Sequence, residues 1–319
     1  MKNHIPGTRR DFIKNATILS AAAPIMPHLL WSQAPSPVND ELQIHLFSKH
    51  FQFLNYEEMA EKAAEMGFDG LDLTVRRGGH VEPEHVEQEL PKAVKAMNQA
   101  GLQPVLMATN VNDAGDELSQ RVLRTAADQG ITHYRMQYYR YLEDKTIPES
   151  IVHYQHQAEK LAKLNQKLGL MGCYQNHAGI RMGSSIWELY ALIMNASEKG
   201  LGAQYDIRHA TVEGGLNWSK GLQLIHPRIQ SFVIKDFKWM EKDGKWFPQN
   251  VPFGEGMVEW KTYFQLLKSY GINVPVSLHL EYPLGGAEKG RSDIEVEPQV
   301  VYDAMKRDLN NVRKLWAEV

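Results

Sequence analysis

Gly169-Leu170-Met171-Gly172-Cys173-Tyr174-Gln175-Asn176-His177 is the stretch that decides the fold. In it, a short apolar run is followed directly by polar residues. Gly169 follows a long amphipathic stretch and is typical of the residue that ends a helix. Leu170–Gln175 has the length and composition of a buried strand. Asn176 and His177 then bring functional groups to the end of that strand. The stretch therefore predicts a helix, a buried strand and a polar site, in that order.

The same pattern recurs along the chain. Four more apolar runs end in chemically capable residues, at Asp72–Arg76, Asp206–His209, Lys235–Asp236 and His279–Glu281. We predict eight strands, at Leu42–Phe47, Leu71–Val75, Pro104–Thr109, Thr132–Gln137, Leu170–Gln175, Ala203–Ile207, Ser231–Ile234 and Val274–Leu280. Amphipathic helical stretches separate them, and Phe237–Gly256 is a long loop in which Asp243-Gly244 suggests a small hairpin.

Alternating strands and helices with reactive groups at the strand ends predict a single-domain (β/α)8 TIM barrel, because such barrels build their sites at that end. A doubly wound open sheet is the competing architecture. It usually has fewer strands, and no Gly-x-Gly-x-x-Gly follows an early strand here.

The first residues have the features of an export signal. Thr8-Arg9-Arg10-Asp11-Phe12-Ile13-Lys14 precedes the apolar segment Ala16–Trp31, which is broken by prolines and is shorter than a membrane span. We predict a twin-arginine signal peptide at 1–34, a linker at 35–41 and the barrel at 42–319, and hence a periplasmic or exported protein. An amphipathic helix belonging to the domain is the alternative.

Net charge and cysteine content restrict the classes of partner that the protein can bind. The formal net charge is −3, and it becomes −6 without residues 1–34, whose own net charge is +3. A mildly acidic body without a basic tract argues against nucleic acid. The single cysteine, Cys173, cannot form an intramolecular disulfide and suits a small buried side chain. We expect a small carbohydrate ligand and no stable membrane insertion, and a homo-oligomer is compatible with the sequence.

Inward positions at a barrel mouth meet at one centre, so polar strand ends are candidate ligands. Carboxylates and imidazoles gathered there suit Mn, Zn, Co or Fe. We expect Asp206, Glu281, Gln175 and His177 to be the metal-ligand candidates. A structural ion pair of Asp206 or Glu281 with Arg208 or Lys235 is the alternative, and His279 suits a hydrogen-bonded core histidine.

Basic residues at the same end suggest binding and catalysis. Lys235 can stabilise an oxyanion or act as an acid or base, and its alternative is a solvated pair with Asp236. Arg76 and His80 lie beside Gly78-Gly79, where the backbone can approach a ligand, and they are candidates to bind hydroxyls or a carboxylate. Lys49 and His50 form a similar pair after the first strand.

Taken in order, the strand ends resemble those of the xylose-isomerase-like barrel family, which also includes sugar phosphate isomerases and endonuclease-IV-like enzymes. The resemblance runs from about Gln43 to the C-terminus. It is carried by Gly67-Phe68-Asp69-Gly70-Leu71-Asp72, Asn176-His177, Tyr205-Asp206 with His209, Ile234-Lys235-Asp236 and Leu280-Glu281.

The resemblance implies one divalent metal held by a Glu, an Asp, a His and a Glu from strands five to eight. It also implies two glutamates that shuttle a proton through a metal-held enediolate. Asp206 and Glu281 match this pattern, whereas Gln175 and Val233 stand where Glu and His are expected. Glutamine cannot take a proton and valine cannot bind a metal, so His177 or His209 is a candidate replacement ligand or base.

We therefore expect an exported isomerase or epimerase that acts on an unphosphorylated sugar. Glu281 is the expected base, Asp206 a ligand or orienting group, and His209 and Lys235 are expected near the substrate oxygens. A lyase or hydrolase that acts on a 3-keto-glycoside is an alternative, as is a non-catalytic sugar-binding barrel that has lost its metal. A DNA repair endonuclease is a third, against which the acidic charge and the export signal count.

Overall fold

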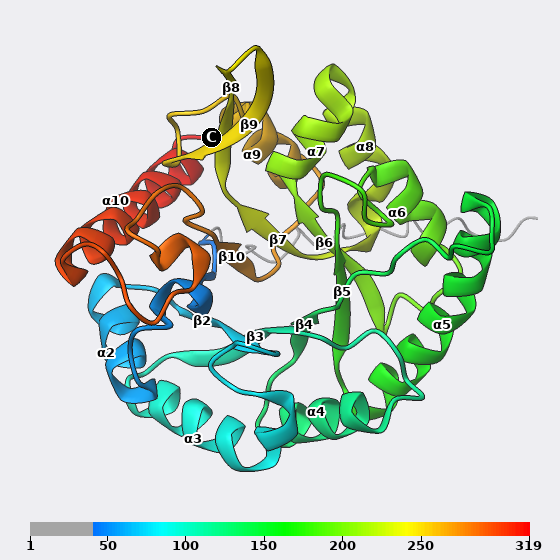
Figure 1. Ribbon diagram of the computed structural model, residues 1–319, viewed down its shortest axis with the longest axis horizontal. Coiled ribbons are helices and arrows are strands. Elements are labelled where there is room, and N and C mark those ends of the chain that lie inside the picture. Colours follow the sequence, from blue (N-terminus) through cyan, green and yellow to red (C-terminus); the bar gives the residue numbers. More distant parts are fainter. Residues whose placement is uncertain (1–40) are drawn as a thin grey trace, which may run out of the picture. The chain divides into compact units, whose positions relative to one another are not determined.

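The computed structural model describes residues 41–319, so the predictions for the signal peptide and most of the linker lie outside the described residues. Within 41–319, eight parallel strands close into a barrel in the order β1-β10-β7-β6-β5-β4-β3-β2 (Figure 1). The strands are β1 (Ile44–Phe47), β2 (Gly70–Val75), β3 (Gln103–Thr109), β4 (His133–Arg135), β5 (Met171–Gln175), β6 (Leu201–Asp206), β7 (Ile229–Ile234) and β10 (Val276–Leu278). The predicted (β/α)8 barrel is confirmed.

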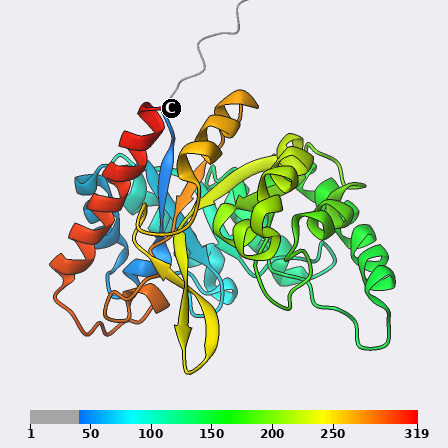
Figure 2. The same ribbon diagram turned by 90° about the horizontal axis from the view of Figure 1, so that it is seen from above.

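Helices surround the barrel and connect its strands (Figures 1 and 2). They are α2 (Tyr56–Met66), α3 (Val86–Gln99), α4 (Glu117–Asp128), α5 (Ile147–Leu168), α6 (Ile186–Ile193), α7 (Ile207–Gly214), α8 (Trp218–Ile225), α9 (Trp260–Ser269) and α10 (Pro298–Ala317). Five short 3-10 turns complete the described part, at Ser48–Phe51, Pro83–His85, Gly215–Asn217, His226–Arg228 and Ala287–Lys289. No helix in this part is long and apolar enough to cross a membrane.

Helix α2 illustrates how the local sequence sets the bounds of an element. Asn55 and Glu58 form a reciprocal capping box at its start, which satisfies two backbone N–H groups. Met59 and Ala63 lie on the buried face against the barrel. Gly67 ends the helix at a φ of 94°, a left-handed conformation that other residues adopt at a cost.

The largest departure from the sequence prediction lies after β6. We expected strand six to extend to Ile207 and its polar end to include His209, but α7 begins at Ile207. The reason is Asp206, whose Oδ1 accepts a hydrogen bond from the backbone N–H of His209 at 3.1 Å and so caps the new helix. His209 therefore comes from the first turn of a helix rather than from a strand.

The segment after β7 is more ordered than a loop. Strands β8 (Asp236–Lys242) and β9 (Lys245–Val251) form an antiparallel hairpin that projects from one end of the barrel (yellow in Figure 2). Asp243 and Gly244 occupy its turn with φ of 54° and 72°, as a two-residue hairpin turn requires. The predicted hairpin is confirmed, and the prediction of a loop is wrong up to Val251 but correct for residues 252–256.

Asp236 fixes the base of this hairpin. Its carboxylate accepts hydrogen bonds from the backbone N–H groups of Phe237, Gly254, Gly256 and Val258, and from the indole N–H of Trp260. A Cβ on Gly256 would lie 2.0 Å from an Asp236 oxygen, so that position requires glycine. The hairpin is therefore anchored immediately beside Lys235, the next residue towards β7.

Candidate active site

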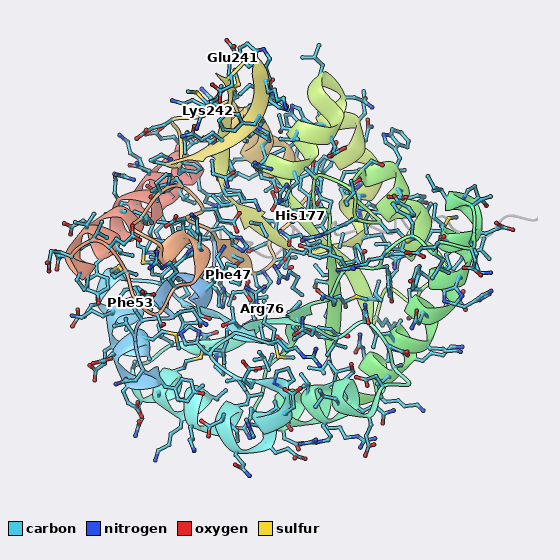
Figure 3. The ribbon with its side chains drawn as sticks, viewed as in Figure 1. Phe47, Phe53, Arg76, His177, Glu241 and Lys242 are labelled. Carbon is cyan, nitrogen blue, oxygen red and sulfur yellow. The ribbon has the colours of Figure 1, made fainter. Side chains whose placement is uncertain are left out.

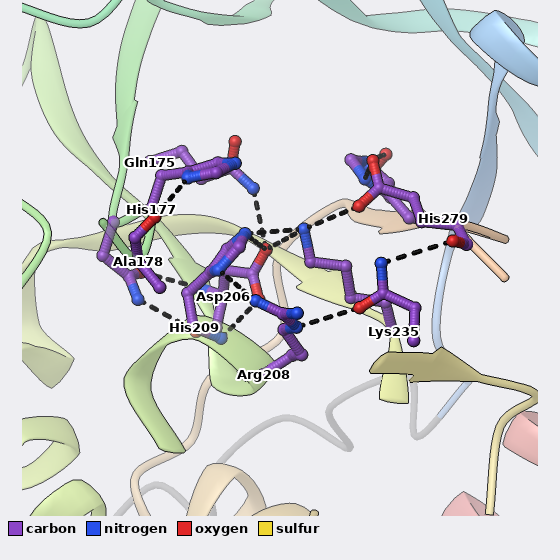
Figure 4. A network of polar contacts seen from close by, with 12 residues as sticks. Gln175, His177, Ala178, Asp206, Arg208, His209, Lys235 and His279 are labelled. Carbon is purple, nitrogen blue, oxygen red and sulfur yellow. Dashed lines mark hydrogen bonds and ion pairs between the residues drawn. The ribbon is translucent and has the colours of Figure 1, made fainter. Parts of the chain in front are cut away.

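The centre of the barrel mouth is an ammonium group held between two carboxylates (Figure 4). The Nζ of Lys235 lies 3.0 Å from Oδ2 of Asp206 and 3.2 Å from Oε2 of Glu281. It also donates to Nε2 of His209 at 2.8 Å. Burial opposes the charge on Lys235, but Asp206 and Glu281 raise its pKa above the usual value. Lys235 is therefore a fully coordinated, charged lysine.

Asp206 is completely buried and serves only as an acceptor. Oδ2 accepts from the side-chain amide of Gln175 at 2.8 Å as well as from Lys235. Asn176 exchanges two hydrogen bonds with the backbone N–H and C=O of Asp206, at 2.8 and 2.9 Å. Burial raises the pKa of Asp206 and Lys235 opposes that rise. Every partner of the carboxylate is a donor, which favours its ionised form and fixes its orientation.

Glu281 carries the carboxylate that faces the cavity, and its side chain is 23% exposed. Oε1 pairs with Lys49 at 2.9 Å and Oε2 pairs with Lys235. Burial alone would raise the pKa of Glu281, but the two lysines hold it well below the usual range. Glu281 is therefore ionised, and its two positive partners balance the charges of both carboxylates.

Two stacked imidazoles lie beside this cluster. The rings of His177 and His209 have centroids 4.0 Å apart. Burial, reinforced by Lys235, lowers the pKa of His177 to about 3, and the same causes place the pKa of His209 well below its usual value. His177 Nδ1 lies 3.0 Å from the carbonyl of Ala178, which can only accept, so Nδ1 carries the proton. Its Nε2 is left as a free lone pair in a side chain that lines the cavity.

The opposite side of the mouth is cationic. The cavity has a volume of about 330 Å³, and its lining includes Phe47, Arg76, Arg135, Tyr138 and Arg181. The guanidinium groups of Arg76 and Arg135 lie 5.4 and 5.6 Å from the centre of the Phe47 ring. Figure 3 shows Phe47, Arg76 and His177 around the centre of the view down the barrel. We name Arg76, Arg135 and Arg181 the arginine wall.

Not every predicted site residue reaches this cavity. Lys49, Arg76, Gln175, His177, Lys235 and Glu281 line it. His50 instead bonds the carbonyl of Ala287 at 3.3 Å and accepts from the backbone N–H of Leu280 at 3.0 Å. His80 contacts Ser48 and Thr74 at 3.2 and 3.0 Å and the carbonyl of Phe51 at 3.1 Å. These contacts support the backbone, so the geometry gives His50 and His80 a structural role.

The structure also adds residues that the sequence analysis missed. His279, expected in the core, stacks on Phe47 with ring centroids 4.2 Å apart and also borders the cavity. Arg135 lies inside β4 and Arg181 in the connection after β5. The available signal for Arg135 was an arginine inside the predicted strand Thr132–Gln137. The aromatic residues of the late loops, Trp239, Trp246, Phe253 and Tyr282, do not line this cavity.

The positions that the family resemblance assigns to metal ligands do not form a metal site here. Val233 is paired in register with Asp206 and offers no donor. Gln175 turns its N–H towards Asp206, while its oxygen accepts from Tyr138. Lys235 places a positive charge between the two carboxylates, where it would repel a dication. Within residues 41–319, no group of three or more His, Cys, Asp or Glu side chains is arranged to hold a metal ion.

Comparison with known proteins places this fold and site in a family. The sequence profile of the xylose isomerase-like TIM barrel family matches residues 60–297, so the chain belongs to that family. Among curated proteins, none shows significant sequence similarity to it.

Solved structures share the fold at low sequence identity. A 3-keto-D-glucoside 4-epimerase from E. coli is 13% identical, with a TM-score of 0.62 over 85% of this chain and 100% of that one. A probable 3-DHS dehydratase from Bacillus anthracis is 13% identical, with a TM-score of 0.60 over 83% and 98%. The IOLI protein with a bound zinc atom is 15% identical, with a TM-score of 0.65 over 86% and 98%. The neighbours thus include an epimerase, a dehydratase and a metal-binding barrel.

Proposed function

We propose that this protein transfers a proton at the carbon next to a sugar carbonyl, as a sugar isomerase or epimerase does. The observation that carries the proposal is the ammonium of Lys235, fixed against the cavity-lining carboxylate of Glu281 at 3.2 Å. Proton abstraction next to a carbonyl needs a base and a positive group for the developing oxyanion. The membership of a family whose relatives include epimerases supports the same reaction class.

Each step can be assigned to a residue of this chain. Glu281 takes the proton, and the electrons of the broken C–H bond move into the carbonyl to form an enediolate. Lys235 stabilises the enediolate oxygen, since it is already charged and oriented by Asp206. Return of the proton from Glu281 to the neighbouring carbon gives the isomer. Donation of a proton to the other face of the same carbon by a second acid on that side gives the epimer.

His177 is the proposed second acid–base group. Its Nε2 is unprotonated, because Nδ1–H is directed to the carbonyl of Ala178, and the side chain lines the cavity. Isomerisation requires a proton to move between two substrate oxygens, and a neutral imidazole can accept and return it. His209 supports this role indirectly, since it stacks on His177 and accepts from Lys235.

The proposed chemistry uses Lys235 as its electrophile and routes no step through a divalent metal. We further propose that residues 1–34 direct export of the protein, as the N-terminal sequence suggests.

A deuterium-exchange experiment tests the proposal. The protein is incubated with aldoses, ketoses and 3-keto-glycosides in deuterated water, and label at carbon is measured by mass spectrometry. The native protein should label at least one sugar, before and after dialysis against a chelator. Glu281→Gln should reduce the rate by ~10²-fold or more, because a glutamine cannot accept the proton.

Glu241→Gln is the matched control, since Glu241 is exposed on the hairpin and should leave exchange unchanged. Exchange by Glu281→Gln within a few-fold of the native rate would show that Glu281 is not the base. Sugar binding without any exchange in the native protein would instead indicate a non-catalytic sugar-binding barrel.

Elimination from a 3-keto-glycoside is the second candidate, and one observation favours it. Gln175 stands where the family resemblance places a second glutamate, so a single carboxylate, Glu281, lines the cavity. One carboxylate suffices to remove a proton and expel a β-substituent through the same enediolate. Release of the aglycone together with an unsaturated ketone would identify elimination, whereas an isomeric product would identify isomerisation.

A further inference from the structure

The cavity contains more positive than negative side chains. Six basic residues line it, and Glu281 is the one lining carboxylate among residues 41–319. The six are Lys49, Arg76, Arg77, Arg135, Arg181 and Lys235. Lys49 and Lys235 are already paired with Glu281 and Asp206, and Arg77 is exposed and directed to Glu84 at 3.8 Å. The remaining excess positive charge lies in the arginine wall.

The arginine wall has no carboxylate partner within the described residues. Neither Arg76, Arg135 nor Arg181 forms an ion pair there, although each is fixed in place against an aromatic ring. Arg135 and Arg181 lie 5.9 and 4.6 Å from the centre of the Tyr138 ring, and Arg76 and Arg135 share the Phe47 ring. Cation–π contacts of this kind hold a guanidinium group without neutralising it.

Two further observations indicate that the protein itself does not satisfy the wall. Arg135 is only 8% exposed, and its Nε has no hydrogen-bond partner. Buried donors are normally satisfied, so this N–H requires an acceptor. Burial and the neighbouring Arg135 also lower the pKa of Arg76 to about 10, which reflects the mutual repulsion of the two groups. An anion placed beside Arg76 and Arg135 would relieve the repulsion between them.

The nearest internal acid does not supply that anion. Asp72 lies deeper in the barrel, where it accepts from Ser277 at 2.7 Å and its other oxygen has no partner. Burial raises the pKa of Asp72 despite the influence of Arg135 and Arg76, which favours its neutral form. The charge of the wall is therefore directed to the cavity.

We propose that the substrate is an anionic carbohydrate, whose carboxylate or phosphate group binds the arginine wall while its carbonyl reaches Lys235 and Glu281. This inference rests on the proposed function for the position of the reacting carbon. Arg135 links the two regions, because its Nη1 lies 3.4 Å from the oxygen of Gln175, which in turn bonds Asp206. A cavity of about 330 Å³ is of the size that holds a small molecule. Guanidinium groups bind carboxylates and phosphates by strong paired hydrogen bonds.

Binding is tested by calorimetry and thermal shift with three probes: D-glucuronate, D-glucose 6-phosphate and D-glucose. The proposal expects one or both acids to bind and raise the melting temperature, with D-glucose weaker by ~10-fold or more. Added salt should weaken the binding of the acids. The acid that binds more tightly, D-glucuronate or D-glucose 6-phosphate, shows whether the anionic group is a carboxylate or a phosphate.

Variants assign the binding to the wall. Arg76→Met and Arg181→Met should each weaken acid binding by ~10-fold or more, because each removes a charge-assisted contact. Arg124→Met, on the surface of α4, should leave it unchanged. Equal binding of acid and neutral sugars, or acid binding that survives Arg76→Met and Arg181→Met, overturns the inference.

Deuterium exchange with the same sugars separates this inference from the proposed function. Acid binding through the wall without exchange of any acidic sugar would contradict the function and leave the inference standing. Exchange of neutral sugars at rates unaffected by Arg76→Met would support the proposed function and contradict the inference of an anionic substrate.

Discussion

The two sides of the barrel mouth treat charge in opposite ways. At β6, β7 and β10, Asp206, Lys235 and Glu281 neutralise one another at 3.0–3.2 Å. At β2, β4 and the connection after β5, the arginine wall has no ion pair within residues 41–319. Paired charges hold a geometry before any ligand arrives, whereas unpaired ones gain their stabilisation from the ligand. The first arrangement suits catalysis and the second suits binding.

Acid should produce the largest effect, through buried histidines that include two beside the paired side, His177 and His209. Seven histidines in the described part have pKa values lowered mainly by burial, among them His177, His209 and His279 at the site, and also His45, His50, His80 and His133. Each binds a proton more readily when unfolded, so the stability present above about pH 6.5 is lost as the pH falls below it.

Urea unfolding at a series of pH values measures this loss. Each histidine contributes up to ~1.4 kcal/mol per pH unit, so the urea midpoint should stay level between about pH 8 and 7 and fall steeply below about pH 6. A midpoint that stays level to about pH 5 would show that these histidines are not held neutral in the folded protein.

Lys235→Met should have the next largest effect, because it breaks the paired side. Removing the ammonium leaves Asp206 and Glu281 with no partner in this position, and an uncompensated buried charge costs ~3–5 kcal/mol. Unfolding in urea should show this loss, and deuterium exchange should fall below detection. Lys242→Met on the hairpin is the matched control and should change neither. A loss below ~1 kcal/mol would mean that the ion cluster does not hold the site together.

Arg76→Met should have the smallest effect on stability, because it acts on the unpaired side. The substitution removes a partly buried charge that Arg135 repels, and it breaks no ion pair within the described part. The free energy of unfolding without ligand should stay within ~1 kcal/mol of the native value or rise. A loss as large as that of Lys235→Met would show that both sides are structural and would remove the contrast between them.

Much of the fold follows from features that act over a few residues. The glycine at Gly169 and the Asp243-Gly244 turn are local features, and both appear in the structure as predicted. The capping box at Asn55 and Glu58 that the structure shows is equally local. Helix α7 was missed because Asp206 serves two purposes. It ends a strand and caps a helix, and its carboxylate is also a site residue.

The sequence predicted the site residues that follow strand ends, but not the way in which side chains from distant segments meet at one cavity. The predicted Glu281 and Lys235 both line the cavity, and the ion pair of Lys235 with Asp206 was among the alternatives. The alternative pairing of Lys235 with Asp236 fails because neighbouring residues of an extended chain point to opposite sides. Arg76, Arg135 and Arg181 lie far apart in the sequence, so only the closed barrel brings them to one cavity.

The anchoring of the β8–β9 hairpin also has a practical consequence. The carboxylate of Asp236 binds both the residue that enters the hairpin and the segment that leads from it to α9. The two hairpin strands pair with each other and with no strand of the barrel. The distal half of the hairpin is therefore a suitable place for an insertion. A fluorophore or an affinity tag inserted between Asp243 and Gly244 would label the protein without displacing Lys235.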